Sequence, residues 1–461
     1  MNKIIERVYV SFDIVLVSPL SIGSGENQNT DMDIIRDCEE MPFIPASSIC
    51  GVLRHWMGKS CGKDDENELF GGIPLFEDTK GRMSRITFYD AFLKDSIEDN
   101  KAKISVRDMV RLDINKSSDN KFDAEILEAG ATFSIKFEIS KRENDKFDCL
   151  KNIAFIMAGI EIDRVRLGRK TRRGFGKIKI DKDTINLKQI KFFNKENIRE
   201  WIDFKWEDIE GSNTEESFIE MLNQTKEELE KNQDDITITA DLQIKHSLMI
   251  RSYLRSKEFD VNTDYEQLKA YNEHGELLPV ISGSSWAGAF RHHGIKLMLE
   301  NGWGSKIDII ESGFGNEDKI KKAPSKIDFS ESHVKDSTSH FLTRVKIDRF
   351  TGGAAESALF SEIPSFGGNT KLTINISSWK NNFKNAFSGL MLLILRDIYN
   401  GILAIGGETS IGRGIMNEND KEFFESVDIK GIEGKDTNEK YLNLLRCFVG
   451  YIKDEEGEYC E

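Results

Sequence analysis

Two stretches of the chain alternate between apolar and polar residues, as half-buried β-strands do. Residues 8–16 (VYVSFDIVL) and residues 236–244 (ITITADLQI) place an apolar side chain at nearly every second position. Later in each half comes an apolar run long enough for a buried helix, at residues 148–160 and 384–400. Strands and helices mixed in this order predict an α+β fold rather than a doubly wound parallel sheet.

A Ser-Ser pair precedes an apolar helical segment in each half and predicts where two further helices begin. The first half reads IPASSICGVLR and the second reads VISGSSWAGAFR. Serine hydroxyls accept hydrogen bonds from the unpaired N–H groups of a first helical turn. We therefore expect Ser47 or Ser48 to cap one helix and Ser284 or Ser285 to cap the other.

These paired features recur at a nearly constant spacing. Ser47 maps onto Ser284 at an offset of 237, and a Gly-rich turn, TRRGFG from Thr171, maps onto TSIGRG from Thr409 at an offset of 238. Two separate matches at almost one offset indicate tandem duplication, and a repeated unit suits a polymeric ligand. The expected segments are a first unit over 1–205, an acidic linker over 206–235, a second unit over 236–416 and an acidic appendage over 417–461.

The acidic total charge conceals a basic turn. The 461 residues carry a formal net charge of −15, yet residues 161–180 hold eight bases and two acids. Local charge decides whether a polyanion binds, so nucleic acid is not excluded. The chain has no apolar stretch long enough for a membrane span or a signal peptide, and its six cysteines show no CxxC spacing. We expect a cytoplasmic protein without structural zinc or a membrane partner.

The Gly-rich turns combine backbone freedom with positive charge. Glycines let main-chain N–H groups approach a phosphate, and arginines add charge-assisted hydrogen bonds. A tight strand connection on a solvated surface would have the same pattern, so both interpretations stay open. The candidate RNA contacts are Arg169, Lys170, Arg172, Arg173, Gly174 and Gly176 in the first turn, and Gly412 and Arg413 in the second.

With these motifs the chain resembles the RAMP superfamily of CRISPR-associated proteins, and within it the backbone subunit of type III effector complexes. That family shows a pattern IPGSSxKGxxR, then LFG, then a strand ending in Asp-Ala-Phe. Here LFG stands at residues 69–71, and the strand at 84–90 runs into Asp90-Ala91-Phe92. In the second unit Phe314-Gly315 leads to a strand at 325–330.

The resemblance implies two tandem RRM-like (ferredoxin-like) RAMP domains with insertions and thumb hairpins. Residues 346–360 resemble the thumb hairpin that inserts between guide and target RNA, and residues 110–115 are its weaker counterpart. The implied partners are a CRISPR guide RNA, a single-stranded target RNA and other CRISPR effector subunits.

The resemblance also implies cleavage of target RNA by an aspartate in the loop before the Ser-Ser helix. The family loop reads IDxPVI(K/R)D, and TDMDIIRD from Thr30 aligns with it and places Asp31 at the catalytic position. TDYEQLKA from Thr263 aligns more loosely and places Asp264 there, while Asp33 competes for the first role. Carboxylates of this kind would hold a divalent metal, Mg or Mn, loosely through Asp31 or Asp264. A solvated loop aspartate is the alternative for each.

Other residues of the repeated helices are candidate RNA contacts. Arg54 and Arg291 lie one turn into these helices and would contact the guide backbone or form ordinary surface salt bridges. The further candidates are Ser47, Ser48, Ser284, Ser285 and Arg349.

Three functions are consistent with this sequence. The first is a fused double backbone subunit that binds guide RNA and cleaves target RNA through its loop aspartates. The second is a structural RNA-binding module without cleavage. The third is a stand-alone RAMP endoribonuclease that processes guide RNA, for which metal-independent cutting at a hairpin would be diagnostic.

Overall fold

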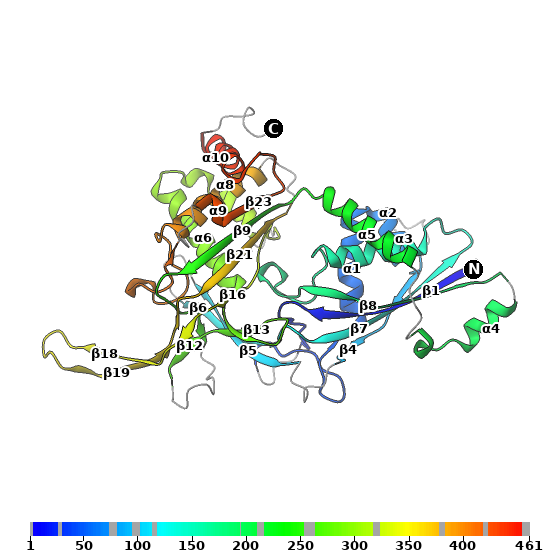
Figure 1. Cartoon of the computed structure of the whole chain (residues 1–461), viewed down its shortest axis with the longest axis horizontal. Coiled ribbons are helices and arrows are strands. Elements are labelled where there is room, and N and C mark those ends of the chain that lie inside the picture. Colours follow the sequence, from blue (N-terminus) through cyan, green and yellow to red (C-terminus); the bar gives the residue numbers. More distant parts are fainter. Residues whose placement is uncertain are drawn as a thin grey trace.

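The computed structural model describes residues 3–25, 30–72, 81–94, 102–112, 118–193, 195–209, 216–252, 263–316, 323–377, 383–417 and 423–453. The chain forms two lobes that follow its two halves (Figure 1). Each lobe has its own apolar core, one built from residues before 230 and the other from residues after 235.

The first lobe is a four-stranded antiparallel sheet in the order β3-β7-β1-β8. α1 (Ala46–Ser60) connects β1 to β3, and α3 (Cys149–Glu161) connects β7 to β8. The order and the two crossover helices are those of a ferredoxin-like βαββαβ unit. The strands are β1 (Ile4–Leu16), β3 (Ile86–Phe88), β7 (Thr132–Arg142) and β8 (Ile178–Lys191).

The second lobe repeats this arrangement. Its strands run in the order β15-β21-β9-β22, all antiparallel, with α6 (Gly283–Glu300) between the first and second in sequence and α8 (Phe383–Tyr399) between the third and fourth. The predicted tandem α+β units are therefore confirmed. The strands are β9 (Ile236–Ile244), β15 (Ile327–Phe329), β21 (Asn369–Ile376) and β22 (Met416–Asn417).

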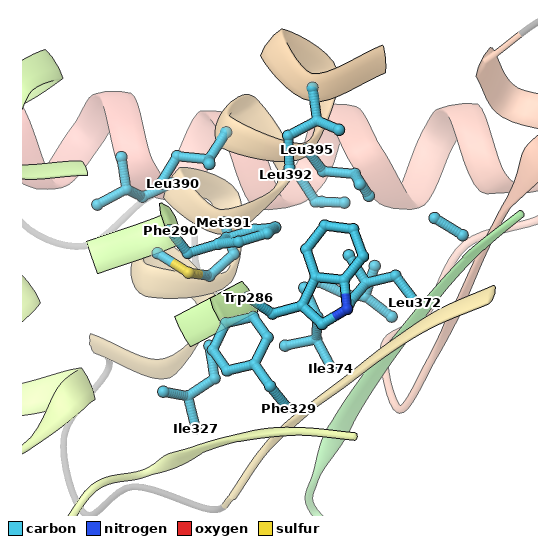
Figure 2. Packing of buried hydrophobic residues seen from close by; sticks show 14 of the residues in the cluster. Trp286, Phe290, Ile327, Phe329, Leu372, Ile374, Leu390, Met391, Leu392 and Leu395 are labelled. Atoms are coloured by element: carbon cyan, nitrogen blue, oxygen red, sulfur yellow. The ribbon is translucent and has the colours of Figure 1, made fainter. Parts of the chain in front are cut away.

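The apolar side of each alternating strand packs under the helices. In β1, Val8, Val10, Phe12 and Ile14 are buried in this way, as period-two alternation requires. Figure 2 shows the corresponding core of the second lobe, where Trp286 and Phe290 of α6 pack beside residues of α8 and β21. The Trp286 indole N–H donates to the Ser332 hydroxyl at 3.0 Å, so this large side chain is buried with its polar atom satisfied.

The predicted serine cap of the first Ser-Ser helix is wrong. α1 has Pro45 at its N-cap position, so Ser47 and Ser48 already lie in the first helical turn. Proline suits a helix start because its φ is preset and it lacks the N–H that would otherwise be unpaired. A side chain from another strand end supplies the missing acceptor, since the Asp90 carboxylate accepts the Ala46 N–H at 2.7 Å.

The predicted cap of the second Ser-Ser helix is also displaced. Ser282 is the N-cap of α6 rather than Ser284 or Ser285, and its hydroxyl oxygen accepts the Ser285 N–H at 3.2 Å. The hydroxyls of Ser284 and Ser285 each lie 2.9 Å from that of Ser282. The helix begins earlier because β14 (Leu277–Ile281) ends directly before Ser282.

A third helix covers the helical layer of each unit. α5 (Glu216–Lys231), inside the stretch expected to be an acidic linker, packs on α3 and places Phe218 and Leu222 in the first core. α10 (Thr437–Lys453), inside the expected appendage, packs on α8 and places Tyr441 and Leu444 in the second core. Each helix lies on the outside of its lobe (Figure 1), and its apolar side completes the core of that unit.

Each unit also carries a β-hairpin. β5 (Ile104–Leu112) pairs with β6 (Ser118–Leu127), and β18 (Leu342–Ile347) pairs with β19 (Ala354–Ile363). The second hairpin projects from its lobe (Figure 1), and Phe350 at its tip is 95% exposed. The expected first thumb at 110–115 lies partly outside the described residues, because 113–117 are not among them.

Short elements complete the chain. The remaining strands are β2 (Phe43–Ile44), β4 (Ala91–Phe92), β10 (Ser247–Leu248), β11 (Arg251–Ser252), β12 (Tyr265–Gln267), β13 (Lys269–Tyr271), β16 (Ser332–Lys335), β17 (Thr338–Ser339), β20 (Ser365–Phe366) and β23 (Val427–Lys430). The remaining helices are α2 (Lys63–Phe70), α4 (Lys195–Asp203), α7 (Asp308–Phe314), α9 (Phe423–Ser426) and the 3-10 turns η1 (Thr171–Arg173), η2 (Trp206–Ile209), η3 (Gly304–Lys306) and η4 (Thr409–Ile411).

Candidate RNA-binding and cleavage site

The two loop aspartates occupy the same position in the two units. The Asp31 carboxylate accepts the N–H of Asp123 on β6 at 3.1 Å, and the Asp264 carboxylate accepts the N–H of Ser361 on β19 at 2.8 Å. Asp123 and Ser361 are 238 residues apart in sequence, the offset of the Gly-rich turns. Both aspartates are exposed, so each places a carboxylate on the surface beside the hairpin of its own unit.

A second acidic residue, which is buried, stabilises each loop by accepting a hydrogen bond from a loop threonine. The Asp33 carboxylate accepts the N–H and the hydroxyl of Thr30, both at 2.8 Å. The Glu266 carboxylate likewise accepts the Thr263 hydroxyl at 2.8 Å, and both acids are buried. Asp33, the alternative candidate for the catalytic role, is therefore buried and holds the loop in place, whereas Asp31 faces outward.

The hairpin residue opposite the aspartate differs between the units. In the first unit the Asp31 N–H also donates to the Asp123 carboxylate at 2.7 Å, so each of these two aspartates accepts the backbone N–H of the other. In the second unit the Ser361 hydroxyl lies 3.4 Å from the Asp264 carboxylate. The sequence analysis missed Asp123, although its offset of 238 from Ser361 pairs the two positions.

The carboxylate pair of the first unit fits a weakly held divalent cation. Mg²⁺ takes oxygen ligands and usually keeps several waters, so one or two carboxylates suffice for a loose site. Across the described ranges, no three or more His, Cys, Asp or Glu side chains gather as metal ligands would. Any bound cation would therefore rest on Asp31 and Asp123 in the first unit and on Asp264 in the second.

An ionic cluster fixes the second loop to its Gly-rich turn. The Tyr265 hydroxyl donates to Glu408 at 2.6 Å, and Arg344 donates to Glu408 at 2.6 Å and to Glu362 at 2.7 Å. Arg413, expected as an RNA contact, is instead buried between the same two carboxylates. The cluster ties together the loop of Asp264, the hairpin and the turn.

The protonation of this cluster follows from its contacts. Burial raises the pKa of Tyr265 to about 12, and its hydrogen bond to Glu408 acts in the same direction. Burial also acts to raise the pKa of Glu408, but hydrogen bonds from Tyr265 and Arg344 outweigh it and hold that pKa at about 2. The second loop is thus anchored by a carboxylate that stays charged at every ordinary pH.

At the place that the ionic cluster occupies in the second unit, the first unit has the basic residues Lys170 and Arg169. Lys170, at the position of Glu408, lies over the Phe122 ring at 4.6 Å and against the Met109 sulfur of the β5–β6 hairpin. Burial, together with the nearby charges of Arg107 and Arg169, lowers its pKa to about 8. Arg169 is exposed, and its guanidinium lies 3.4 Å from the sulfur of Met32, the residue after Asp31. Positive charge therefore lies beside the first aspartate.

The two Gly-rich turns have the same backbone. Each opens on a non-glycine residue in the left-handed region, Lys170 at φ 58° and Glu408 at φ 59°, and closes on Gly174 at φ 93° and Gly412 at φ 87°. A side chain at Gly176 would collide with the Leu167 carbonyl oxygen. Glycine is required here for the turn itself, whatever the turn binds.

The first turn packs against the second unit. Arg172 donates to Asp328 at 2.8 Å and to the Ser377 hydroxyl at 3.0 Å, and its side chain stays 41% exposed. A side chain at Gly174 would meet the backbone of Glu331, and one at Gly283 would collide with the Arg173 carbonyl oxygen. The basic turn is therefore a contact between the units, and Arg172 and Arg173 are half-buried there.

The other candidates lie on the helices and the second hairpin. Arg54 pairs with Glu66 at 2.8 Å and donates to the Gly71 carbonyl, so it holds α1 to α2. Arg291 is exposed on α6, and Arg349 is exposed in the turn of the second hairpin. Ser47 and Ser284 are exposed, and Ser48 and Ser285 are half-buried.

A profile of the RAMP superfamily matches residues 13–179 and 241–417, which cover most of both βαββαβ units. The chain belongs to the RAMP superfamily. The two matched segments agree with two fused RAMP units in one chain. No curated protein matches the sequence.

Membership of this superfamily gives the protein a CRISPR-associated role in RNA binding. RAMP proteins bind CRISPR RNA and act in effector complexes. In the part of the chain that the structure describes, no helix has the length and apolar character needed to cross a bilayer.

Proposed function

We propose that this double RAMP protein is a guide-RNA-binding backbone subunit of a type III CRISPR effector complex and that it cleaves complementary target RNA. One observation carries the proposal: Asp31 and Asp264 project from equivalent loops and are held by equivalent hairpin residues. A hairpin that inserts between guide and target would splay a target nucleotide beside such a carboxylate. Exposed apolar residues such as Phe350 and Leu359 on the second hairpin suit contact with bases.

The reaction would be an internal transfer at a phosphodiester. The 2′-hydroxyl of the splayed nucleotide loses its proton and its oxygen attacks its own 3′-phosphorus. The bond to the 5′-oxygen of the next nucleotide breaks, that oxygen takes up a proton from water, and a 2′,3′-cyclic phosphate forms. The loop carboxylate would orient the 2′-hydroxyl or take up its proton. A divalent ion on Asp31 and Asp123 would neutralise charge on the phosphate. Arg169 and Lys170 would bind phosphates of the guide RNA beside this site.

A non-catalytic RNA-binding role is the second candidate, and a specific contact favours it. Each aspartate already accepts a backbone N–H from its hairpin, which is a structural task. Asparagine keeps an acceptor oxygen for that hydrogen bond but loses the negative charge. Cleavage that survives Asp31→Asn and Asp264→Asn together, with the hairpins in place, would favour the structural role.

Arg169 and Arg172 should differ in RNA binding although they share one turn. Arg169→Ala should weaken binding of a single-stranded guide RNA several-fold and lower the salt slope by about 0.7, the value for one phosphate contact on a single strand. Arg172→Ala should change the slope less, because its guanidinium is paired with Asp328. Binding titrations at several salt concentrations test this. Equal slopes for the wild type and Arg169→Ala would remove Arg169 from the interface.

RNA affinity should fall as the pH rises through about 8, the pKa of Lys170 in the free protein. Its amine would be about nine-tenths charged at pH 7 and about one-tenth charged at pH 9. Lys170→Arg should abolish this pH dependence because arginine remains charged across the range. Guide-RNA titrations at pH 7, 8 and 9 measure the effect. An identical pH profile for wild type and Lys170→Arg would exclude a phosphate contact by Lys170.

A further inference from the structure

The junction between the two units is a head-to-tail interface held by ion pairs. We name the residues of the first unit that face the second its tail surface, and the residues of the second unit that receive them its head surface. Among the described residues three ion pairs cross the junction, namely Arg107 with Glu331, Arg164 with Asp235 and Arg172 with Asp328. In every pair the tail surface supplies the cation and the head surface supplies the anion.

A head-to-tail interface between two similar units leaves one of each surface unused. The second unit has an outer tail surface, and the first unit has an outer head surface. Hydrogen bonds common to both units identify the equivalent residues. Ile402 is equivalent to Arg164, because the Arg164 N–H donates to the Gly159 carbonyl oxygen and the Ile402 N–H donates in the same way to the Asp397 carbonyl oxygen. Ser410 is equivalent to Arg172, because both are the central residue of their turns, η4 and η1.

The hairpins and sheets identify the other equivalent residues. Arg107 directly precedes the strand partner of Asp123, and Leu342 directly precedes the strand partner of Ser361. On the head surface, Arg7 is equivalent to Asp235, because each directly precedes the matching strand residue, Val8 or Ile236. Thr87 is equivalent to Asp328, because each is the central residue of its strand, β3 or β15. Asp90 is equivalent to Glu331, because each follows a residue, Tyr89 or Ser330, whose N–H donates to the equivalent strand of its unit.

The outer surfaces have lost all three ion pairs. On the outer tail surface the three cations are replaced by Leu342, Ile402 and Ser410. On the outer head surface the acids at two of the three positions are replaced by Arg7 and Thr87. A second copy docked in the same way would set Arg7, which is already paired with Glu138 of its own unit, against Ile402, and Asp90 against Leu342, so no ion pair would form across the contact.

The outer tail surface is also apolar where the inner one is basic. Ile402 is 67% exposed, and Ile411, at the position of Arg173, is 55% exposed. Gly412 has open space around it, whereas the equivalent Gly174 is covered by the second unit. Protruding isoleucines around an open backbone turn fit a partner that is uncharged and apolar at the matching positions.

We infer that the outer tail surface binds a different polypeptide with an uncharged, apolar head surface, and that it excludes a second copy of this chain. The loss of ion pairs sets this specificity, because it removes attraction toward the chain's own acidic or basic head residues. Two copies of this chain would then not be neighbours in an assembly, because neither copy could dock on the outer tail surface of the other. The inference rests on the duplication and its junction and is independent of RNA cleavage.

The test re-creates the inner ion pairs on the outer surfaces of two variants of the full chain. A tail variant carries Leu342→Arg, Ile402→Arg and Ser410→Arg. A head variant carries Arg7→Asp, Thr87→Asp and Glu138→Asn, with Asp90 already acidic, because Glu138 pairs with Arg7 and the strand partner of Asp328 in the second unit is Asn375. After nuclease treatment, light scattering should find wild type and each variant monomeric at tens of micromolar. Mixing the two variants should give a 1:1 complex at low salt that dissociates at about 0.5 M salt, where charges are screened within a few ångströms.

The controls separate this inference from its alternatives. Each variant mixed with wild type should stay monomeric, and melting curves verify that each variant is folded. Self-association of the wild type would overturn the inference directly. A mixture of two folded variants that remains monomeric would also overturn it, because ion pairs would then not decide which surface binds which.

Discussion

Asp31→Ala should remove one cleavage position on a complementary target RNA and leave guide and target binding intact. Asp264→Ala should remove a second position, one unit further along the target. The equivalent placement of the two carboxylates is the reason, because each would act only on the nucleotide beside its own hairpin. We expect about a hundredfold loss of rate or more at the affected position. The measurement is the cleavage pattern of a labelled target incubated with the assembled complex and a divalent ion.

Asparagine variants are the matched controls for this experiment. Asp31→Asn keeps an acceptor for the Asp123 N–H and should still lose cleavage, because the charge and not the hydrogen bond is needed. A chelator should stop cutting at both positions, and the upstream product should end in a 2′,3′-cyclic phosphate. Unchanged cutting by the double alanine variant would exclude both aspartates and leave the structural RNA-binding role.

Arg107→Leu should destabilise the protein by about 3–5 kcal/mol, the usual cost of leaving a buried charge without its partner. Arg107 is 4% exposed and pairs with Glu331 across the junction and with Glu128 at its own hairpin. Without the guanidinium, both buried carboxylates would lack their cation. Thermal or urea unfolding of the full chain measures the loss.

The pH dependence of this loss has a definite sign. Burial already raises the pKa of Glu331 in the wild type, and Arg107 opposes that rise. Removing Arg107 should raise this pKa further, so the carboxyl can take up a proton when the pH falls. A group whose folded pKa exceeds its unfolded value loses stability as the pH rises. The destabilisation should therefore be smaller at pH 5 than at pH 8.

Arg172→Met is the matched control at the same junction. Its guanidinium is 41% exposed, so its pair with Asp328 should contribute about 1 kcal/mol or less. Equal losses for Arg107→Leu and Arg172→Met would contradict the view that burial, and not the number of ion pairs, holds the two units together.

Much of the fold follows from local patterns in the sequence. Alternation in residues 8–16 and 236–244 predicts the central strands, and apolar runs predict α3 and α8, because one face of each element must be buried. The offset of 238 between the Gly-rich turns anticipates their shared backbone, since only glycine fits at Gly176 and Gly414. These signals lie within a few residues of each other or repeat at a fixed spacing.

What the sequence analysis missed depends on contacts between distant residues. Asp123 reaches Asp31 across 92 residues, and Arg172 reaches Asp328 across 156. No local pattern shows that a basic turn faces the next unit of the same chain rather than solvent. The helix caps were misplaced for a similar reason, because Asp90 serves the first turn of α1 from 44 residues away.

The central claim, that this protein binds guide RNA along two equivalent units, is tested most directly by sequencing the RNA that co-purifies with it. The account predicts short RNAs of defined length whose sequences come from CRISPR repeats and spacers, bound at physiological salt and lost from a chain carrying Arg169→Ala and Lys170→Ala. A preparation free of RNA, or one holding random fragments of cellular transcripts that the double variant retains equally, would contradict it.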